Sequence, residues 1–156
     1  MLKSVRVASI VTLLIGCSVV TGCVQISPGY VVYDGANYLL QPAPGCNIVF
    51  TEVDVTYLVG PPASETDVPV WSVTFAPESK VNRVVLFGHN PDAVTEVQSH
   101  AVDTSRTISV TWSDDGVGRG GVVGVLDNLV PGTVLWTKGF EDAQKYADKA
   151  HVRFGC

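Results

Sequence analysis

Residues 49–59 read Val-Phe-Thr-Glu-Val-Asp-Val-Thr-Tyr-Leu-Val, and this stretch decides the fold class. Its odd-numbered positions are mostly apolar, whereas Glu52, Asp54 and Thr56 lie between them. Successive side chains of a β-strand point to opposite faces of a sheet. The alternation therefore predicts a strand with one buried and one solvated face.

The same period recurs along the chain. Predicted strands lie at residues 30–33, 71–75, 84–87, 107–112, 122–126, 134–136 and 152–154. Turn-forming Gly, Pro, Asn and Asp residues separate these runs. Because short strands with such spacing are typical of sandwiches and barrels, we expect residues 29–156 to form an all-β domain, an antiparallel β-sandwich that is immunoglobulin-like or similar.

One segment departs from the strand period. Glu141 and Lys145 are four residues apart, which suits an ion pair on a helix. The apolar residues around them also lie at helical spacing: Phe140, Ala143, Ala147 and Ala150. We expect one short helix near the C-terminus, followed by a last strand in which His151 faces solvent.

The first residues have the features of an export signal. Lys3 and Arg6 precede a mostly apolar run at 7–15, which is shorter than the roughly 20 residues that span a bilayer. The signal ends at Val20-Thr21-Gly22-Cys23, which resembles a bacterial lipobox. We therefore expect a lipoprotein signal peptide at 1–22, lipidation of Cys23, and a short linker at 23–28 that keeps the domain close to the membrane.

Two other assignments compete with this one. Leu14-Ile15-Gly16-Cys17 is a second lipobox candidate, although the bulky Ile15 stands where a small residue is usual. The other alternative is an ordinary signal peptide that happens to contain cysteines. Cys23 is favoured because a small residue, a glycine and a cysteine directly follow an apolar run.

The remaining cysteines support the same choice. If Cys23 is lipidated, Cys17 leaves with the signal, and Cys46 and Cys156 remain as a pair. Two cysteines in an exported domain predict one disulfide, with two free thiols as the alternative. An anchor at Cys17 leaves an odd cysteine.

The charge of the mature chain limits its partners. Without Lys3 and Arg6 it has 8 basic and 15 acidic residues, a net charge near −7. No basic patch is evident, so no nucleic-acid partner is expected. Because anionic lipid headgroups repel such a domain, membrane attachment is assigned to the acyl chains, of which two or more anchor stably.

The sequence contains few candidates for chemistry, and we predict no enzyme, cofactor or metal site. His89, His100 and His151 are scattered, and the glycines between 116 and 124 are not followed by a helix that could bind phosphate, so a flexible hairpin connection is preferred. Asp114 and Asp115 with Asp127 could supply oxygen ligands to Ca²⁺, but a solvated turn is the preferred interpretation. Three tryptophans, Trp71, Trp112 and Trp136, are expected in the core, with a shared apolar pocket as the alternative.

Four stretches together resemble the mycobacterial nineteen-kilodalton lipoprotein antigen family, the LpqH type. They are residues 31–35 (Val-Val-Tyr-Asp-Gly) with Cys46 after them, 85–91 (Val-Leu-Phe-Gly-His-Asn-Pro), 107–121, and 148–156, which ends on a cysteine. The resemblance covers about half of the mature chain. The chain departs from the family in its very short linker and in an apparent insertion at 60–80.

The resemblance implies an acylated, non-catalytic antigen at the extracytoplasmic face of a cell membrane that host receptors sense, and it also implies the same disulfide. Two further hypotheses remain open. One is an envelope lipoprotein that holds a lipid or another apolar ligand between its sheets. The other is a phage- or prophage-encoded lipoprotein that alters the surface of its host.

Overall fold

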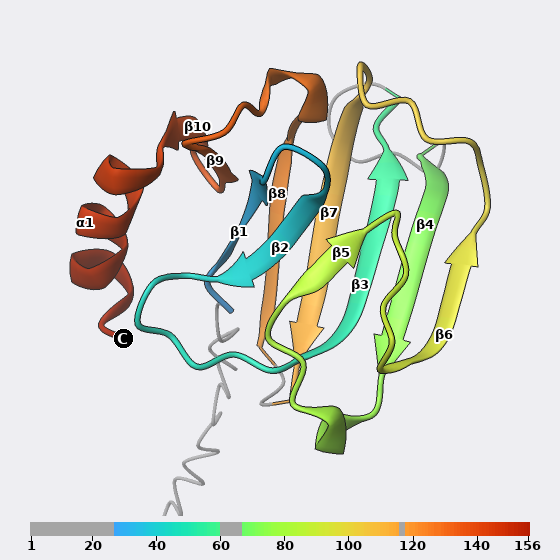
Figure 1. Cartoon of the computed structure of the whole chain (residues 1–156), viewed down its shortest axis with the longest axis horizontal. Helices are drawn as coiled ribbons and strands as arrows, with labels where there is room; N and C mark the ends of the chain where they lie inside the picture. The colour runs from blue at the N-terminus through green and yellow to red at the C-terminus, as the bar shows by residue number, and fades with distance from the viewer. Residues whose placement is uncertain (1–26, 60–66, 116–117) are drawn as a thin grey trace, which may run out of the picture.

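The computed structural model describes residues 27–59, 67–115 and 118–156, which form two packed antiparallel sheets of five strands each and one α-helix (Figure 1). The smaller sheet has the order β10 (Gly139–Asp142), β9 (Thr133–Trp136), β1 (Gly29–Tyr33), β2 (Tyr38–Pro42) and β5 (Val84–Leu86). The larger sheet has the order β6 (Ala93–Gln98), β4 (Val68–Phe75), β3 (Phe50–Tyr57), β7 (Thr107–Asp114) and β8 (Arg119–Val125). The expectation of an all-β sandwich is confirmed.

The main core lies between the two sheets. Val53, Val55 and Tyr57 of β3 are buried there, whereas Glu52 and Asp54 point outward, as their alternation predicts. The smaller sheet contributes Val31, Leu40, Val84, Leu86 and Leu135 to the same cluster. Burial of these apolar side chains, at roughly 25 cal/mol per Å², is the main driving force for packing the sheets together.

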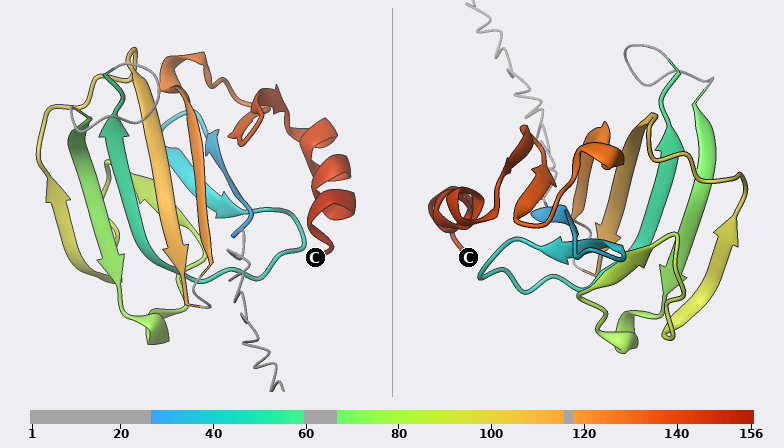
Figure 2. Two further views of the ribbon diagram at one scale, coloured as in Figure 1. Left: turned by 180° about the vertical axis from the view of Figure 1, so that it is seen from behind. Right: turned by 45° about the horizontal axis from the view of Figure 1, so that its top comes forward.

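The helix α1 (Ala143–Phe154) packs beside β9 and β10 at one edge of the smaller sheet (Figure 2). Tyr146 and Ala150 are four residues apart and pack on Val134 and Trp136 in a second core cluster. The Asp142 side chain accepts hydrogen bonds from Gln144 N at 3.0 Å and Lys145 N at 3.1 Å, and so caps the first turn. The sandwich therefore has a third, partial layer.

The predicted last strand at 152–154 is wrong, because α1 continues through Phe154 and ends at Gly155 in the left-handed region (φ 66°). Phe154 lies four residues after Ala150 and packs against the second core cluster, so helical burial outweighs the local alternation of the segment. Phe140 belongs to β10 instead of the helix, and Glu141 pairs with Lys149, not with Lys145. His151 is exposed as expected, but on the helix.

The other predicted strands are present, with ends shifted by a few residues. Three strands were not predicted: β2, β6 and β10. Leu39 and Leu40 are neighbours in β2 and point to opposite faces of the sheet, yet both are buried. The strand therefore lacks the apolar–polar alternation from which it could have been predicted. β6 is an exposed edge strand, and its side chains carry no apolar period. Two 3₁₀ turns, η1 (Pro77–Ser79) and η2 (Leu126–Asn128), complete the described elements.

Both described termini lie at one end of the sandwich, which we call the entry end (Figure 1). β1 and β8 begin there and β2 and β7 finish there, because Gly29 pairs with Pro42 and Ser113 pairs with Arg119. The opposite end, called the far end, carries the turn at 34–37 and the loop at 99–106. α1 runs from the far end to the entry end, where Cys156 follows it.

Candidate functional site

The residues predicted for export, Cys17 and Cys23 with the signal peptide at 1–22, lie outside the described residues. Ser27, the first residue of the described domain, has a fixed position. Ser27 is only 2 % exposed, and its N–H donates a hydrogen bond to Arg119 O over 3.0 Å. It is held against the first residue of β8, so the linker meets the domain at a defined position.

Trp112 secures the same residue from inside the core. Its indole Nε1 donates to Ser27 O over 3.0 Å and lies 3.2 Å from Ser27 Oγ. The indole N–H is the one polar group of an otherwise apolar ring, and a buried tryptophan usually finds it a partner. Ser27 and Trp112 are 85 residues apart, so this contact ties the start of the domain to β7 of the larger sheet.

Two glycines make room for the Trp112 ring. A Cβ on Gly29 would lie 2.8 Å from Trp112 Cζ2, and a Cβ on Gly120 would lie 2.3 Å from both Trp112 Cε2 and Ser27 O. Gly120 pairs directly with Trp112 across β7 and β8. The expected role of the glycines at 116–124 as a flexible connection is therefore wrong for Gly120, which lies in a strand and permits close packing.

Cys46 and Cys156 form a disulfide, as predicted. Their Cα atoms are 4.8 Å apart, within the usual range for a disulfide, and 110 residues of sequence separate them. Cys46 packs against both core clusters, whereas Cys156 is exposed. The bond therefore joins the end of α1 to the loop between β2 and β3.

A short series of contacts connects the disulfide with Ser27. Ala43 N donates to Pro28 O over 2.8 Å, and Cys46 N donates to Ala43 O over 2.9 Å. A Cβ on Gly45, whose φ is +84°, would come within 3.0 Å of Cys156 O. The loop at 43–46 thus holds the start and the end of the domain together at the entry end.

The second core cluster contains an unusual buried polar group. Tyr146 is 1 % exposed, and among the residues that the structure describes its hydroxyl has no hydrogen-bond partner. Its ring lies 5.0 Å from the Tyr30 ring and 5.2 Å from the Trp136 ring. Burial in these aromatic surroundings raises the pKa of Tyr146 above its ordinary value and keeps the phenol neutral.

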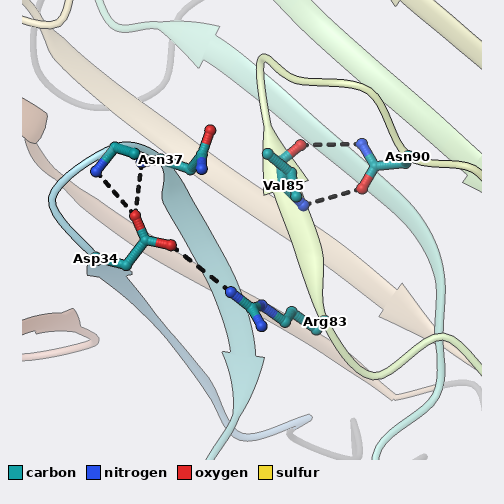
Figure 3. Close-up of polar contacts among 6 residues, drawn as sticks. Asp34, Asn37, Arg83, Val85 and Asn90 are labelled. Atoms are coloured by element: carbon teal, nitrogen blue, oxygen red, sulfur yellow. Dashed lines mark hydrogen bonds and ion pairs between the residues drawn. The ribbon is translucent and has the colours of Figure 1, made fainter.

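Asn90 replaces a neighbouring strand at the outer edge of β5 (Figure 3). Its side-chain oxygen accepts from Val85 N over 2.9 Å, and its side-chain nitrogen donates to Val85 O over 2.9 Å and to Gly88 O over 3.1 Å. An amide side chain carries the same donor and acceptor as a peptide unit, so it satisfies both backbone groups of Val85. The preceding turn places Phe87 at φ 59°.

Replacing Asn90 with aspartate is expected to destabilise the domain by about 2 kcal/mol, because the carboxylate keeps the acceptor but loses both donated hydrogen bonds. Asn82→Asp is the matched control, since Asn82 is exposed and its substitution should change the free energy of unfolding by less than about 0.5 kcal/mol. Chemical denaturation of the two variants measures the difference. Equal stabilities would contradict the role given to Asn90.

The turn between β1 and β2 is held by Asp34 (Figure 3). Its Oδ1 accepts from Asn37 N over 2.8 Å and from Ala36 N over 2.9 Å, and its Oδ2 lies 3.7 Å from the Arg83 guanidinium. These backbone hydrogen bonds, from Asn37 first and Ala36 second, lower the pKa of Asp34. The predicted Asp-Gly turn is confirmed, with Gly35 at φ 99°.

A shallow polar depression of about 280 Å³ lies on the outer face of the larger sheet. Glu52, Asp54, Thr111, Ser113 and Arg119 line it, over Trp112 and Gly120. Desolvation, followed by the nearby Glu52 charge, raises the pKa of Asp54. This surface is solvated and open, as the wet face of the predicted strand implies.

The structure separates the residues considered for metal or catalytic chemistry. Asp114 Oδ1 accepts from Gly118 N at the entry end, whereas Asp127 accepts a hydrogen bond from Thr104 at the far end. Within the part of the chain that the structure describes, no three His, Cys, Asp or Glu side chains are grouped as metal ligands. His100 is near Pro69 O, with Nδ1 at 2.7 Å, and His89 and His151 lie in other segments.

The three tryptophans are buried, as expected, but in two places. Trp71 and Trp112 belong to the main core, and Trp136 belongs to the cluster beneath α1. They do not line one shared pocket. Among the residues with described positions, no helix has the length and apolar character needed to cross a membrane.

Sequence reasoning missed Ser27, Gly120, Asn90 and Tyr146. The Asn-Pro pair at 90–91 signals a turn but not the burial of the asparagine side chain. The Gly-Gly pair directly before an apolar run was the available signal for close approach at Gly120, because glycine inside a strand often marks such a position. Comparisons with protein families, with curated proteins and with solved structures found no match to this chain.

Proposed function

We propose that this chain is a non-enzymatic cell-envelope lipoprotein, held at the extracytoplasmic face of a cell membrane by acyl chains on Cys23. Its β-sandwich is displayed outside the membrane, in the manner that the resemblance to the nineteen-kilodalton antigen family implies. The anchor is the N-terminal cysteine, and the domain begins four residues later at Ser27.

The observation that carries this proposal is the Cys46–Cys156 disulfide. Disulfides persist in exported proteins and are rare in the reducing cytosol. The pairing uses the two cysteines that follow the proposed signal and leaves Cys23 available as the lipid acceptor. It agrees with the arithmetic by which Cys23, and not Cys17, leaves no odd thiol in the mature chain.

A pair of cysteine variants tests the anchor. In a bacterial host that processes lipoproteins, Cys23→Ala is expected to abolish incorporation of a labelled fatty acid and to release the protein from the membrane fraction. Cys17→Ala is the matched control, because this substitution removes the other lipobox candidate and should leave labelling and fractionation unchanged.

Loss of labelling and of membrane association in Cys17→Ala, but not in Cys23→Ala, would assign the anchor to Cys17. Retention of the Cys23→Ala variant in the membrane fraction, together with unchanged fatty-acid labelling, would contradict the proposed anchor. Mass measurement of the mature N-terminus distinguishes these results, since each anchor predicts a different first residue.

A further inference from the structure

We propose that the C-terminal half of α1, at the entry end of the sandwich, contacts anionic lipid headgroups, and that the far end points away from the bilayer. This inference rests on the proposed anchor at Cys23. It adds an orientation and a lipid-binding surface that the anchor alone does not supply. The argument combines the position of Ser27, the length of the linker, and the distribution of charge over α1.

The first step is the fixed position of Ser27. Its backbone is hydrogen-bonded to Arg119 and Trp112, and its carbonyl oxygen occupies the space that a Cβ on Gly120 would need. The linker therefore joins the domain at the entry end. Only three residues lie between Cys23 and Ser27, so Ser27 is at most about 14 Å from the lipidated residue, at about 3.5 Å per step.

The second step compares this length with the size of the domain. The eight residues of β7 run from the far end to the entry end, a length of about 27 Å at 3.4 Å per residue. The linker is about half as long as the sheet, and it begins at one end of it. The turn at 34–37 follows the five residues of β1, so in an upright domain it lies about 17 Å further from the headgroups than the start of β1 does.

The third step places α1 at the same end as the linker. Two hydrogen bonds connect Pro28 to Ala43 and Ala43 to Cys46, and the disulfide connects Cys46 to Cys156. The last turn of α1 is thereby held beside the point where the linker enters, and Figures 1 and 2 show the C-terminus and the start of β1 at the same end. Lipid headgroups near the linker lie next to this turn.

The charge distribution then selects the partner. The mature chain is acidic, yet four of its eight basic residues, Lys138, Lys145, Lys149 and Arg153, fall between positions 138 and 153. Lys145, Lys149 and Arg153 are exposed on α1. Three acidic residues share this range: Glu141 pairs with Lys149, Asp142 caps the opposite end of the helix, and the exposed Asp148 accepts a hydrogen bond from Gln144. Residues 143–154 carry three basic side chains and one acidic side chain, a net charge of +2, whereas the mature chain as a whole is acidic.

Val152 adds an apolar element to this basic surface. It is 84 % exposed, and it lies between His151 and Arg153 in the last turn of the helix. Basic residues near an anionic membrane surface are attracted to it. Basic side chains around an exposed apolar residue are typical of a surface that rests in the headgroup layer.

The experiment uses the full lipidated chain in vesicles. A genetically encoded fluorescent amino acid replaces Val152 in one variant and Ala36, an exposed residue of the far end, in the other. Vesicles of phosphatidylcholine with phosphatidylglycerol carry a contact quencher on their headgroups. We expect strong quenching at position 152 and only background quenching at position 36. Quenching at 36 that equals or exceeds that at 152 overturns the orientation.

A charge comparison tests the lipid partner separately. Lys149→Gln with Arg153→Gln, which changes the two basic residues in the C-terminal half of α1, should reduce quenching at position 152 in the anionic vesicles to the level found with phosphatidylcholine alone. Lys80→Gln with Arg106→Gln removes the same charge elsewhere on the domain and should leave the signal unchanged. If both pairs of substitutions have the same effect, or if neither has any, the headgroup contact is overturned.

Flotation of the vesicles separates this inference from the proposed function. Wild-type chain that fails to float with vesicles overturns both the anchor and the orientation. Chain that floats, but with the quenching pattern reversed or uniform, overturns the orientation alone and leaves the anchor at Cys23 in place.

Discussion

Replacing Cys46 and Cys156 together with serine is expected to lower the free energy of unfolding by about 4 kcal/mol. The disulfide closes a loop of 110 residues, and a loop of that order restricts the unfolded chain by up to about 4.7 kcal/mol in the chain-entropy account. Removing a native disulfide typically costs about 2–5 kcal/mol. The corresponding fall in Tm is about 13 °C for a domain of this size.

Calorimetry of the full chain in detergent measures this change. Each single substitution should destabilise the domain about as much as the double one, because either change removes the same bond. If the losses of unfolding free energy in the two single variants add up to the loss in the double variant, the two sulfurs act separately. A double variant with an unchanged Tm would contradict a stabilising crosslink altogether.

Loss of the disulfide should also destabilise the end of α1 locally. α1 is attached to the smaller sheet by one face, through Tyr146 and Ala150, and by the disulfide that follows it. Without the bond, the last turn of the helix is free to fray, and trypsin should cleave at Lys149 and Arg153 sooner than at Arg106. Equal cleavage rates at these three positions would argue against a local role for the disulfide.

Substituting Gly120 with alanine is expected to destabilise the domain by about 3 kcal/mol and to lower Tm by about 10 °C. The added methyl group would lie 2.3 Å from both Ser27 O and Trp112 Cε2. One of these atoms belongs to the backbone, and the other to a ring that is 3 % exposed and packed edge-on against Phe50. Neither gives way at low cost, because a close-packed core has little free volume.

Gly121→Ala is the matched control. A Cβ at this neighbouring position lies 3.3 Å from Thr111 Cγ2 and Val110 O, on the outer face of the sheet. Its effect on the free energy of unfolding should stay within about 1 kcal/mol. Hydrogen exchange of the Trp112 indole N–H provides a second measurement, which should accelerate in the Gly120 variant only. Equal stability of the two variants would contradict the close packing at Gly120.

These two predictions differ in how far the sequence anticipates them. The disulfide follows from counting the cysteines that remain after a predicted signal peptide, and the structure brings those two residues together. The packing at Gly120 does not follow from its sequence neighbourhood. A run of glycines has the same composition in a loose hairpin and beneath an indole ring, and only the pairing of Trp112 with Gly120 distinguishes the two.

The helix illustrates a different limit. The alternation of His151, Val152, Arg153 and Phe154 fits a strand locally, and the helical spacing of Tyr146, Ala150 and Phe154 fits a helix equally well. The second interpretation holds because Val134 and Trp136 provide an apolar face on the smaller sheet for those side chains. Tertiary packing of an amphipathic face usually decides whether a short helix forms.

The sequence by itself determined the sandwich class, most of the strands and the cysteine pair. Each of these follows from a local period or from a count of residues, and the alternation at 49–59 holds whatever packs on the strand. The tertiary structure alone decided where Ser27 is held, which glycine packs against the Trp112 ring, how the Asn90 side chain bonds the backbone of β5, and where α1 ends. These features join residues that are far apart in the chain or depend on which side chains are buried, and the register that brings them together is set when the two sheets and the helix pack.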